Sequence, residues 1–152
     1  MKIYVDADGF PKAVKEILIR AAIRHQVSVV FVANKPFRHE QSSLFTYVLV
    51  PEGPDIADDR IAELAESGDL VITGDIPLAD RVVSKGACAL DPRGKLYTEA
   101  NVKNCLAVRN LLSSLRDEGM PAGGPPAFGK KDCLAFADKL DSFLVRQLKG
   151  KK

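Results

Sequence analysis

The hydrophobic positions of this chain alternate between short continuous runs and stretches with helical spacing. The continuous runs are rich in β-branched residues, which is typical of buried strands in a parallel sheet. We expect such strands at residues 3–5, 27–32, 46–50, 70–72 and 87–90. Between them, apolar residues recur three or four positions apart, as along the buried face of an amphipathic helix. Helices are therefore expected at residues 11–24, 55–66 and 78–84.

Strands that alternate with helices at this pitch predict an α/β fold: one three-layer domain with a mainly parallel sheet flanked by helices. The last third of the chain carries two longer amphipathic helices, at 100–116 and 131–148, joined by a Gly/Pro-rich loop. We expect no strand beyond residue 90, so these helices pack on the sheet or form a homo-oligomer with a second copy. The domain is expected to cover 1–148, followed by a mobile basic tail at 149–152.

The composition is that of an ordinary globular protein. Hydrophobic residues make up 46% of the 152 positions and charged residues 28%. The net charge of +2 is too small to imply a nucleic-acid partner by itself. No apolar run approaches the ~18 residues that a membrane helix needs. Because an acid already appears at Asp6, a signal peptide is not expected either, and we predict a cytoplasmic protein without a membrane partner.

The cysteines and histidines show no spacing that suggests a zinc site or a disulfide framework. The three cysteines are far apart and form no CxxC pair, which fits a reducing cytoplasm. The chain also lacks a Walker loop, a G-x-G-x-x-G fingerprint and a G-x-S-x-G elbow. The function classes that depend on these motifs are therefore excluded.

The most informative stretch runs from Gly68 to Asp80. The expected strand 70–72 runs out at Thr73 and Gly74, and Asp75 follows at once. Pro77 suits the first turn of a new helix. In open α/β sheets the functional crevice lies outside the carboxyl ends of the strands. Asp75 is therefore placed for chemistry.

Other aspartates are expected at the same edge of the sheet. They follow the first strand, open the second helix, or lie one turn beyond Asp75: Asp6, Asp8, Asp55, Asp58, Asp59 and Asp80. Clustered carboxylates are the ligands that Mg²⁺ and Mn²⁺ prefer. A pair of such ions ~4 Å apart can activate water for phosphodiester hydrolysis. The sequence thus indicates a metal-dependent phosphodiesterase.

Each of these acids also has a purely structural explanation. Asp55 can cap the second helix, with Asp58 and Asp59 facing the positive end of its dipole. Asp80 can be a solvated helix residue, and an aspartate that ends a strand can cap a turn. Two acids on separate strands, together with a third source, favour a site over independent capping.

Groups that could hold a polyanion are scattered along the chain. Asn34, Lys35 and Arg38 follow the second strand, and Arg93 follows the fifth. Each could contact a phosphate, and each could equally be a solvated surface residue. Phe37 could stack on a base or pack within its loop.

The order of several motifs resembles the YaiI/YqxD family of uncharacterised bacterial proteins, over nearly the whole chain. The motifs are Val5-Asp6-Ala7-Asp8, Ala57-Asp58-Asp59, residues 69–79, Lys85-Gly86-Ala87, Pro92-Arg93-Gly94 and Gly123-Gly124-Pro125. The family's Asp-Ala-Asp-Ala-Cys-Pro opening is altered here to residues 6–11, Asp-Ala-Asp-Gly-Phe-Pro. Any role of that cysteine therefore does not carry over.

More distantly, the first two-thirds is similar to PIN-like (PilT N-terminus) nuclease domains. Asp6 ends the first strand, Asp58 precedes Ile61 and Ala65 by three and seven residues, and Asp75 closes a Leu-Val-x-Thr-x-Asp strand. The resemblance implies that these three aspartates are Mg²⁺ or Mn²⁺ ligands of a nuclease. The PIN pattern has a further acid in an intervening helix, which has no clear counterpart in this chain.

The sequence therefore predicts a metal-dependent nuclease of PIN-like fold that acts on RNA or DNA, with RNA preferred. The predicted catalytic residues are Asp6, Asp58 and Asp75. The predicted metal ligands add Asp8, Asp59 and Asp80, and the predicted substrate contacts are Asn34, Lys35, Arg38 and Arg93. The main alternative is a non-catalytic RNA-binding or assembly module with a degenerate acidic pocket. A small-nucleotide hydrolase is a third hypothesis.

Overall fold

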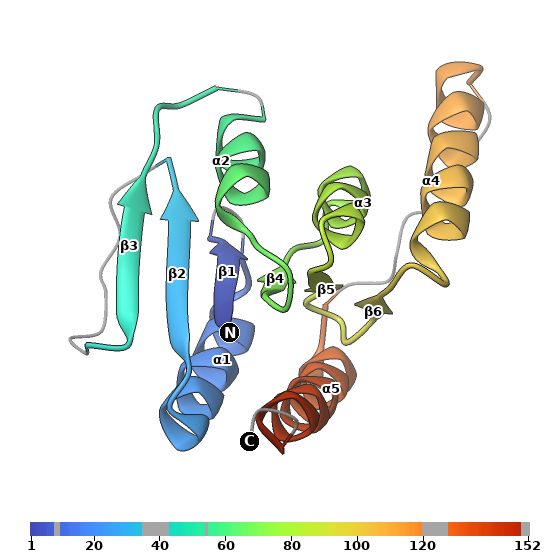
Figure 1. Cartoon of the computed structure of the whole chain (residues 1–152). Helices are drawn as coiled ribbons and strands as arrows, with labels where there is room; N and C mark the ends of the chain where they lie inside the picture. Colours follow the sequence, from blue (N-terminus) through green and yellow to red (C-terminus); the bar gives the residue numbers. More distant parts are fainter. Residues whose placement is uncertain (8–9, 35–42, 54, 120–127, 150–152) are drawn as a thin grey trace.

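The computed structural model describes residues 1–7, 10–34, 43–53, 55–119 and 128–149, and it shows helices alternating with strands (Figure 1). The strands are β1 (Lys2–Asp6), β2 (Ser28–Ala33), β3 (Phe45–Leu49), β4 (Leu70–Ile72), β5 (Cys88–Leu90) and β6 (Leu96–Tyr97). The helices are α1 (Lys12–His25), α2 (Ile56–Leu64), α3 (Ile76–Ser84), α4 (Val102–Asp117) and α5 (Lys130–Lys149).

The six strands form one sheet in the order β3-β2-β1-β4-β5-β6. All neighbouring pairs are parallel except β5 with β6. The chain first builds outward from β1 through β2 to β3, and then returns to place β4 on the other side of β1. The strand order thus reverses between β1 and β4, which is the point where open α/β sheets bind their ligands.

Two hydrophobic cores, one on each face of the sheet, confirm the predicted three-layer α/β fold. On one face, α1 and α5 lie side by side, and Leu18 and Phe136 are fully buried against sheet residues such as Phe31. On the other face, α2 and α3 bury Ile61 and Val82. The central strands are apolar on both faces because helices cover both.

The C-terminal third differs from the sequence prediction in one respect. Residues 96–97 form β6, an antiparallel edge strand, where no strand was expected. Two residues give too short a run to show an alternating pattern, so propensity alone cannot reveal it.

The two C-terminal helices pack differently. α5 packs on the sheet, which is one of the two arrangements predicted for the C-terminal helices. α4 contacts α3. It buries only Val102 fully, while Leu111 is 60% exposed.

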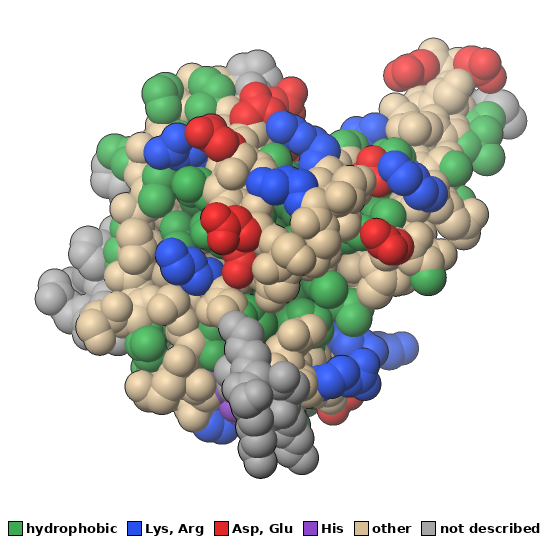
Figure 2. Space-filling model, in the orientation of Figure 1, with side chains coloured by type: hydrophobic (Ala, Val, Ile, Leu, Met, Phe, Trp, Pro, Cys, Tyr) green, Lys and Arg blue, Asp and Glu red, His purple; other side chains and the backbone are tan. Residues whose placement is uncertain are grey.

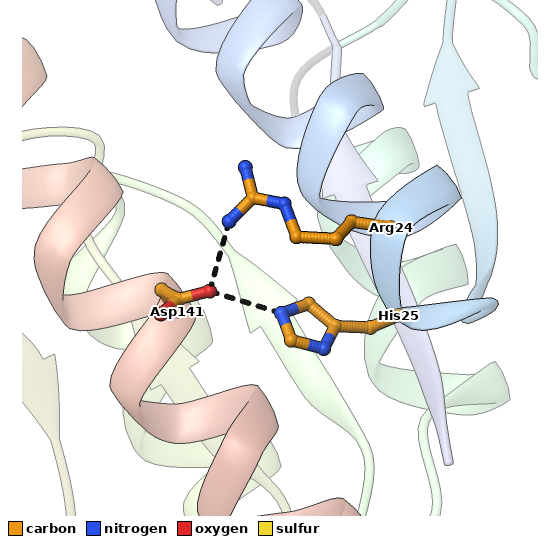
Figure 3. Close-up of polar contacts among 3 residues, drawn as sticks. All are labelled: Arg24, His25 and Asp141. Carbon is orange, nitrogen blue, oxygen red and sulfur yellow. Dashed lines mark hydrogen bonds and ion pairs between the residues drawn. The ribbon is translucent and has the colours of Figure 1, made fainter.

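A polar junction joins α5 to the end of α1. Asp141 accepts a hydrogen bond from Arg24 Nη1 at 3.2 Å, and its Oδ1 lies 2.9 Å from His25 Nε2 (Figure 3). Both basic residues occupy the last turn of α1. A carboxylate on α5 thus ties the C-terminal helix to the first helix of the chain, at the edge of the buried α1–α5 contact.

Within the described ranges, no helix combines the length and the apolar character needed to cross a membrane. α5 extends to Lys149, the first residue of the predicted tail, and residues 150–152 lie outside the described residues.

Candidate functional site

The carboxyl edge of the sheet brings aspartates from separate parts of the chain together. Asp6 is the last residue of β1, and Asp75 follows the neighbouring β4 by three residues. Asp58 lies in the first turn of α2, the helix that leads from β3 to β4. All three are half-buried. The convergence predicted from the sequence therefore falls at the reversal of strand order.

Asp75 is held by the turn that ends β4. Its backbone N–H donates to the hydroxyl of buried Thr73 at 3.0 Å, and its own Oδ1 accepts the backbone N–H of Leu78 at 3.0 Å. Asp75 is thus the N-cap of α3, with Pro77 in the first turn. Asp75 therefore has the capping role that was one explanation for an aspartate at the end of a strand. The cap fixes one carboxylate oxygen, and the same side chain faces Asp58.

Asp55 does not cap α2 through its side chain. It occupies the N-cap position in the left-handed conformation, with φ of 62°, and makes no side-chain cap hydrogen bond. Its backbone carbonyl accepts the N–H of Asp59 at 2.8 Å instead. A left-handed backbone is uncommon outside glycine, although Asp tolerates it better than most residues. The Asp55 carboxylate is left on the same hollow as Asp58 and Asp75.

The electrostatics single out Asp58. Burial raises the pKa of Asp58 to about 7, and a hydrogen bond with Asp75 and the negative charge of that residue act in the same direction. The charges of Asp6 and Asp55 raise it further. Like charges at short range disfavour simultaneous ionisation, so the Asp58–Asp75 pair holds a proton near neutral pH.

A hollow of about 390 Å³ lies in front of this pair. Its walls come from α2, α3 and α4, and Figure 2 shows acidic and basic side chains interspersed over α2 and α3. The lining residues are Asp55, Asp58, Asp59, Asp75, Pro77, Leu78, Arg81 and Arg109. The hollow is thus a carboxylate-rich pocket with two arginines at its walls.

The two arginines were not predicted from the sequence. Arg81 lies one helical turn after Pro77 and Leu78, and its Nη1 pairs with Asp59 Oδ1 at 2.7 Å. That spacing from the predicted helix start was an available signal for Arg81. Arg109 belongs to α4, whose place in space no local pattern reveals.

Two of the predicted site residues are engaged elsewhere. Asp80 Oδ1 forms an ion pair with Lys103 Nζ of α4 at 2.7 Å. Arg93 Nη1 lies 3.2 Å from Asp132 Oδ2, and its guanidinium lies over the Phe128 ring. Neither residue is among those that line the hollow in the described part of the chain.

The remaining predicted residues lie mostly outside the described residues. This holds for Asp8, Lys35 and Arg38. Asn34 is described and follows β2 directly, at the same edge of the sheet as Asp6.

The donor set suits a hard divalent cation, because it offers neighbouring carboxylate oxygens, and a cation can replace the proton that Asp58 and Asp75 hold between them. Asp58 and Asp75 are the pair that would hold such an ion, and Asp6 lies near enough to raise the pKa of Asp58. Among the residues described, no three carboxylate, histidine or cysteine side chains are gathered closely enough to hold a metal ion. The described residues therefore bring two carboxylates together, with a third carboxylate nearby.

Comparison with known proteins identifies the family. The sequence model described as "Uncharacterized BCR, YaiI/YqxD family" matches residues 4–146. The chain belongs to the YaiI/YqxD family. The resemblance to this family noted in the sequence is thereby confirmed. Three of the family motifs carry the acids of the hollow or its edge: residues 5–8, 57–59 and 69–79.

Curated relatives carry the name "UPF0178 protein" and match over nearly their whole length. One from Trichlorobacter lovleyi is 50% identical over 152 residues, covering 100% of this chain and 99% of its own. One from Maridesulfovibrio salexigens is 51% identical over 148 residues, covering 97% and 98%. No solved structure matches the chain. The comparisons thus establish the family of this chain, and the printed names of these relatives state no activity.

Proposed function

We propose that this protein is a metal-dependent phosphodiesterase of the cytoplasm that hydrolyses nucleic acid, with RNA preferred to DNA. The observation that carries the proposal is the proton-sharing pair Asp58–Asp75, with Asp6 nearby, at the point where the strand order reverses. An acid with a shifted pKa that faces a second carboxylate in a hollow is typical of catalytic sites.

Asp58 and Asp75 would hold Mg²⁺ or Mn²⁺, with Asp6 and the undescribed Asp8 as further ligands. When bound, a divalent cation supplies Lewis-acid polarisation of a phosphoryl group and neutralises negative charge at the reacting centre. Asp58 would give up its proton when it holds the cation, since the ionised carboxylate is the ligand form. Affinity for the cation is therefore expected to rise with pH through about 7.

The chain's own contacts keep this pair in place. The hydrogen bond from Leu78 N–H fixes the Asp75 carboxylate at the end of β4. The Arg81–Asp59 ion pair connects α3 to α2 beside it. Because both acids are mounted on helix starts that pack on the sheet, a substrate phosphate meets a site that is organised beforehand.

The proposal is tested with a fluorogenic RNA oligonucleotide and Mn²⁺. Asp58→Asn and Asp75→Asn should each lower the rate of hydrolysis by about a hundredfold or more. Asp138→Asn, at an exposed position on α5, is the matched control and should retain the wild-type rate. Unchanged rates in both site variants would overturn the proposal.

One observation favours the non-catalytic alternative. Asp75 has a complete structural role as the N-cap of α3, so this carboxylate has a reason to be present without any metal. An RNA-binding module would bind RNA equally well in wild type and Asp75→Asn, with no turnover at any Mn²⁺ concentration. Wild type and Asp75→Asn, compared for both RNA binding and RNA hydrolysis, therefore distinguish a nuclease from an RNA-binding module.

A further inference from the structure

The hollow in front of Asp58 and Asp75, called the acidic hollow below, also has a positively charged side chain in its wall. That side chain belongs to a helix outside the part of the chain that is similar to nuclease domains. Arg109 of α4 lines the hollow together with Asp58 and Asp75. α4 follows β6 and lies beyond the first two-thirds of the chain. A cation beside clustered carboxylates offsets the repulsion that they exert on a phosphate.

The two arginines of the hollow differ in what they bind. Arg81 is committed to Asp59 at 2.7 Å. Arg109 donates from Nη1 to the neighbouring Asn110 Oδ1 at 3.2 Å, and within the described residues no carboxylate forms an ion pair with it. The guanidinium of Arg109 therefore keeps most of its donors for a ligand.

Contacts at the start of α4 set where Arg109 lies. Lys103 pairs with Asp80 of α3 at 2.7 Å, and Val102 is buried against the α3 side of the sheet. Arg109 comes six residues after Lys103 on the same helix, about 9 Å along its axis. Asp80 thus acts on the site through α4, by holding the helix that presents Arg109.

A second hollow lies next to the first. It has a volume of about 410 Å³, runs between β3 and α2, and shares Asp59 with the acidic hollow. A ligand longer than one phosphodiester therefore has room to extend past Asp58 and Asp75.

We propose that Arg109 binds a phosphate of the substrate adjacent to the one that is cleaved, and so selects oligonucleotides over isolated phosphodiesters. The inference rests on the proposed function. Arginine suits this role because its planar fork binds phosphate oxygens through two parallel hydrogen bonds. Arg109 is a substrate-binding residue in this scheme, while Asp80 and Lys103 are positioning residues.

Binding is measured by fluorescence anisotropy with a short labelled RNA in EDTA, so that no cleavage occurs. Arg109→Ala should weaken binding about tenfold and reduce the slope of log affinity against log salt by about 0.7, the value for one lost contact on a single strand. Arg116→Ala, an exposed position in the last turn of the same helix, is the matched control and should change affinity by less than about twofold. Arg109→Lys should lie between wild type and Arg109→Ala.

Kinetics separate this inference from the proposed function. With Mn²⁺, Arg109→Ala should raise KM for the RNA more than KM for bis(p-nitrophenyl) phosphate, which has a single phosphate. Equal effects of Arg109→Ala and Arg116→Ala on RNA binding, or no RNA binding by the wild type, would overturn the inference. RNA binding that depends on Arg109, without hydrolysis of either substrate, would overturn the proposed function, and Arg109 would then stand as an RNA-binding residue of a non-catalytic module.

Discussion

The carboxyl group of Asp58, in the first turn of α2, hydrogen-bonds to the carboxylate of Asp75, the N-cap of α3. The two helices start at the same edge of the sheet, on either side of the point where strand order reverses. An isolated aspartate is ionised at neutral pH, whereas Asp58 with a pKa of about 7 is half protonated. The pair therefore stores a proton that a divalent cation can replace.

Ionisation of Asp58 makes the metal-free protein less stable as the pH rises. The pKa of Asp58 is about 7 in the folded protein and ~3.9 in the unfolded chain, so between these values the folded state binds more protons. The free energy of unfolding attributed to this group therefore falls as the pH increases, and the contribution is lost once the pH passes 7. We expect the Tm in EDTA to fall from pH 5 to pH 8 more steeply in wild type than in Asp58→Asn.

The neighbouring acid provides the control for this pH dependence. Asp59 is exposed and pairs with Arg81, so Asp59→Asn should keep the wild-type slope of Tm against pH. If Asp58→Asn shows that same slope, Asp58 does not titrate as described.

Asp75 serves both the site and the fold, and two substitutions separate these roles. Asp75→Asn keeps an acceptor for Leu78 N–H and should preserve stability within about 0.5 kcal/mol, while Asp75→Ala should lower it by about 1 kcal/mol through loss of the cap. Urea unfolding at pH 7 in EDTA measures both. Equal stability of the two variants would show that the cap hydrogen bond contributes nothing.

Gly94 is required where the turn after β5 meets α5. Its φ is +94°, and a Cβ built there would lie 2.7 Å from the backbone carbon of Ala135. Gly94→Ala should cost about 3 kcal/mol in the free energy of unfolding, through backbone strain together with displacement of α5. Gly119→Ala is the comparison, because its φ of +82° is similar but the space around it is open, and the cost should be about 1 kcal/mol. Equal losses of stability in the two variants would mean that α5 moves away from the new methyl group without a measurable free-energy change.

The Asp141 junction between α1 and α5 should contribute measurably to stability. Asp141→Ala removes the contacts with Arg24 and His25 and should lower the free energy of unfolding by about 1 kcal/mol (Figure 3). Asp138→Ala, one turn earlier on the exposed side of the same helix, should stay within about 0.5 kcal/mol of wild type. Chemical denaturation curves for the three proteins decide between a stabilising junction and a surface contact without effect.

Much of the fold follows from hydrophobic patterning, because both faces of a parallel sheet are buried and its strands are apolar throughout. That is why β1, β2 and β4 are recognisable from their sequences alone. The two residues of β6 are not, since two positions are too few to show a pattern; they pair with β5 after a turn that contains Gly94.

The site was predictable to the extent that it depends on strand ends. Asp6 and Asp75 lie where the parallel-sheet argument places them, and Asp58 follows from the start of the next helix. Arg109 was not predictable in the same way, because the docking of α4 on α3 is a long-range contact, made by buried Val102 and by the Asp80–Lys103 pair. Asp80 lies one turn beyond Asp75, but it pairs with Lys103 of α4 and does not join the aspartates that line the hollow.

The most direct test of the central claim is a calorimetric titration of wild type and Asp75→Asn with Mn²⁺ at pH 7, in two buffers of different ionisation enthalpy. We predict that wild type binds Mn²⁺ and releases protons, seen as a buffer-dependent heat, because Asp58 must ionise. Binding should be lost in Asp75→Asn, which keeps the helix cap. Identical titrations of the two proteins, or no binding by either, would contradict the assignment of Asp58 and Asp75 as a metal site.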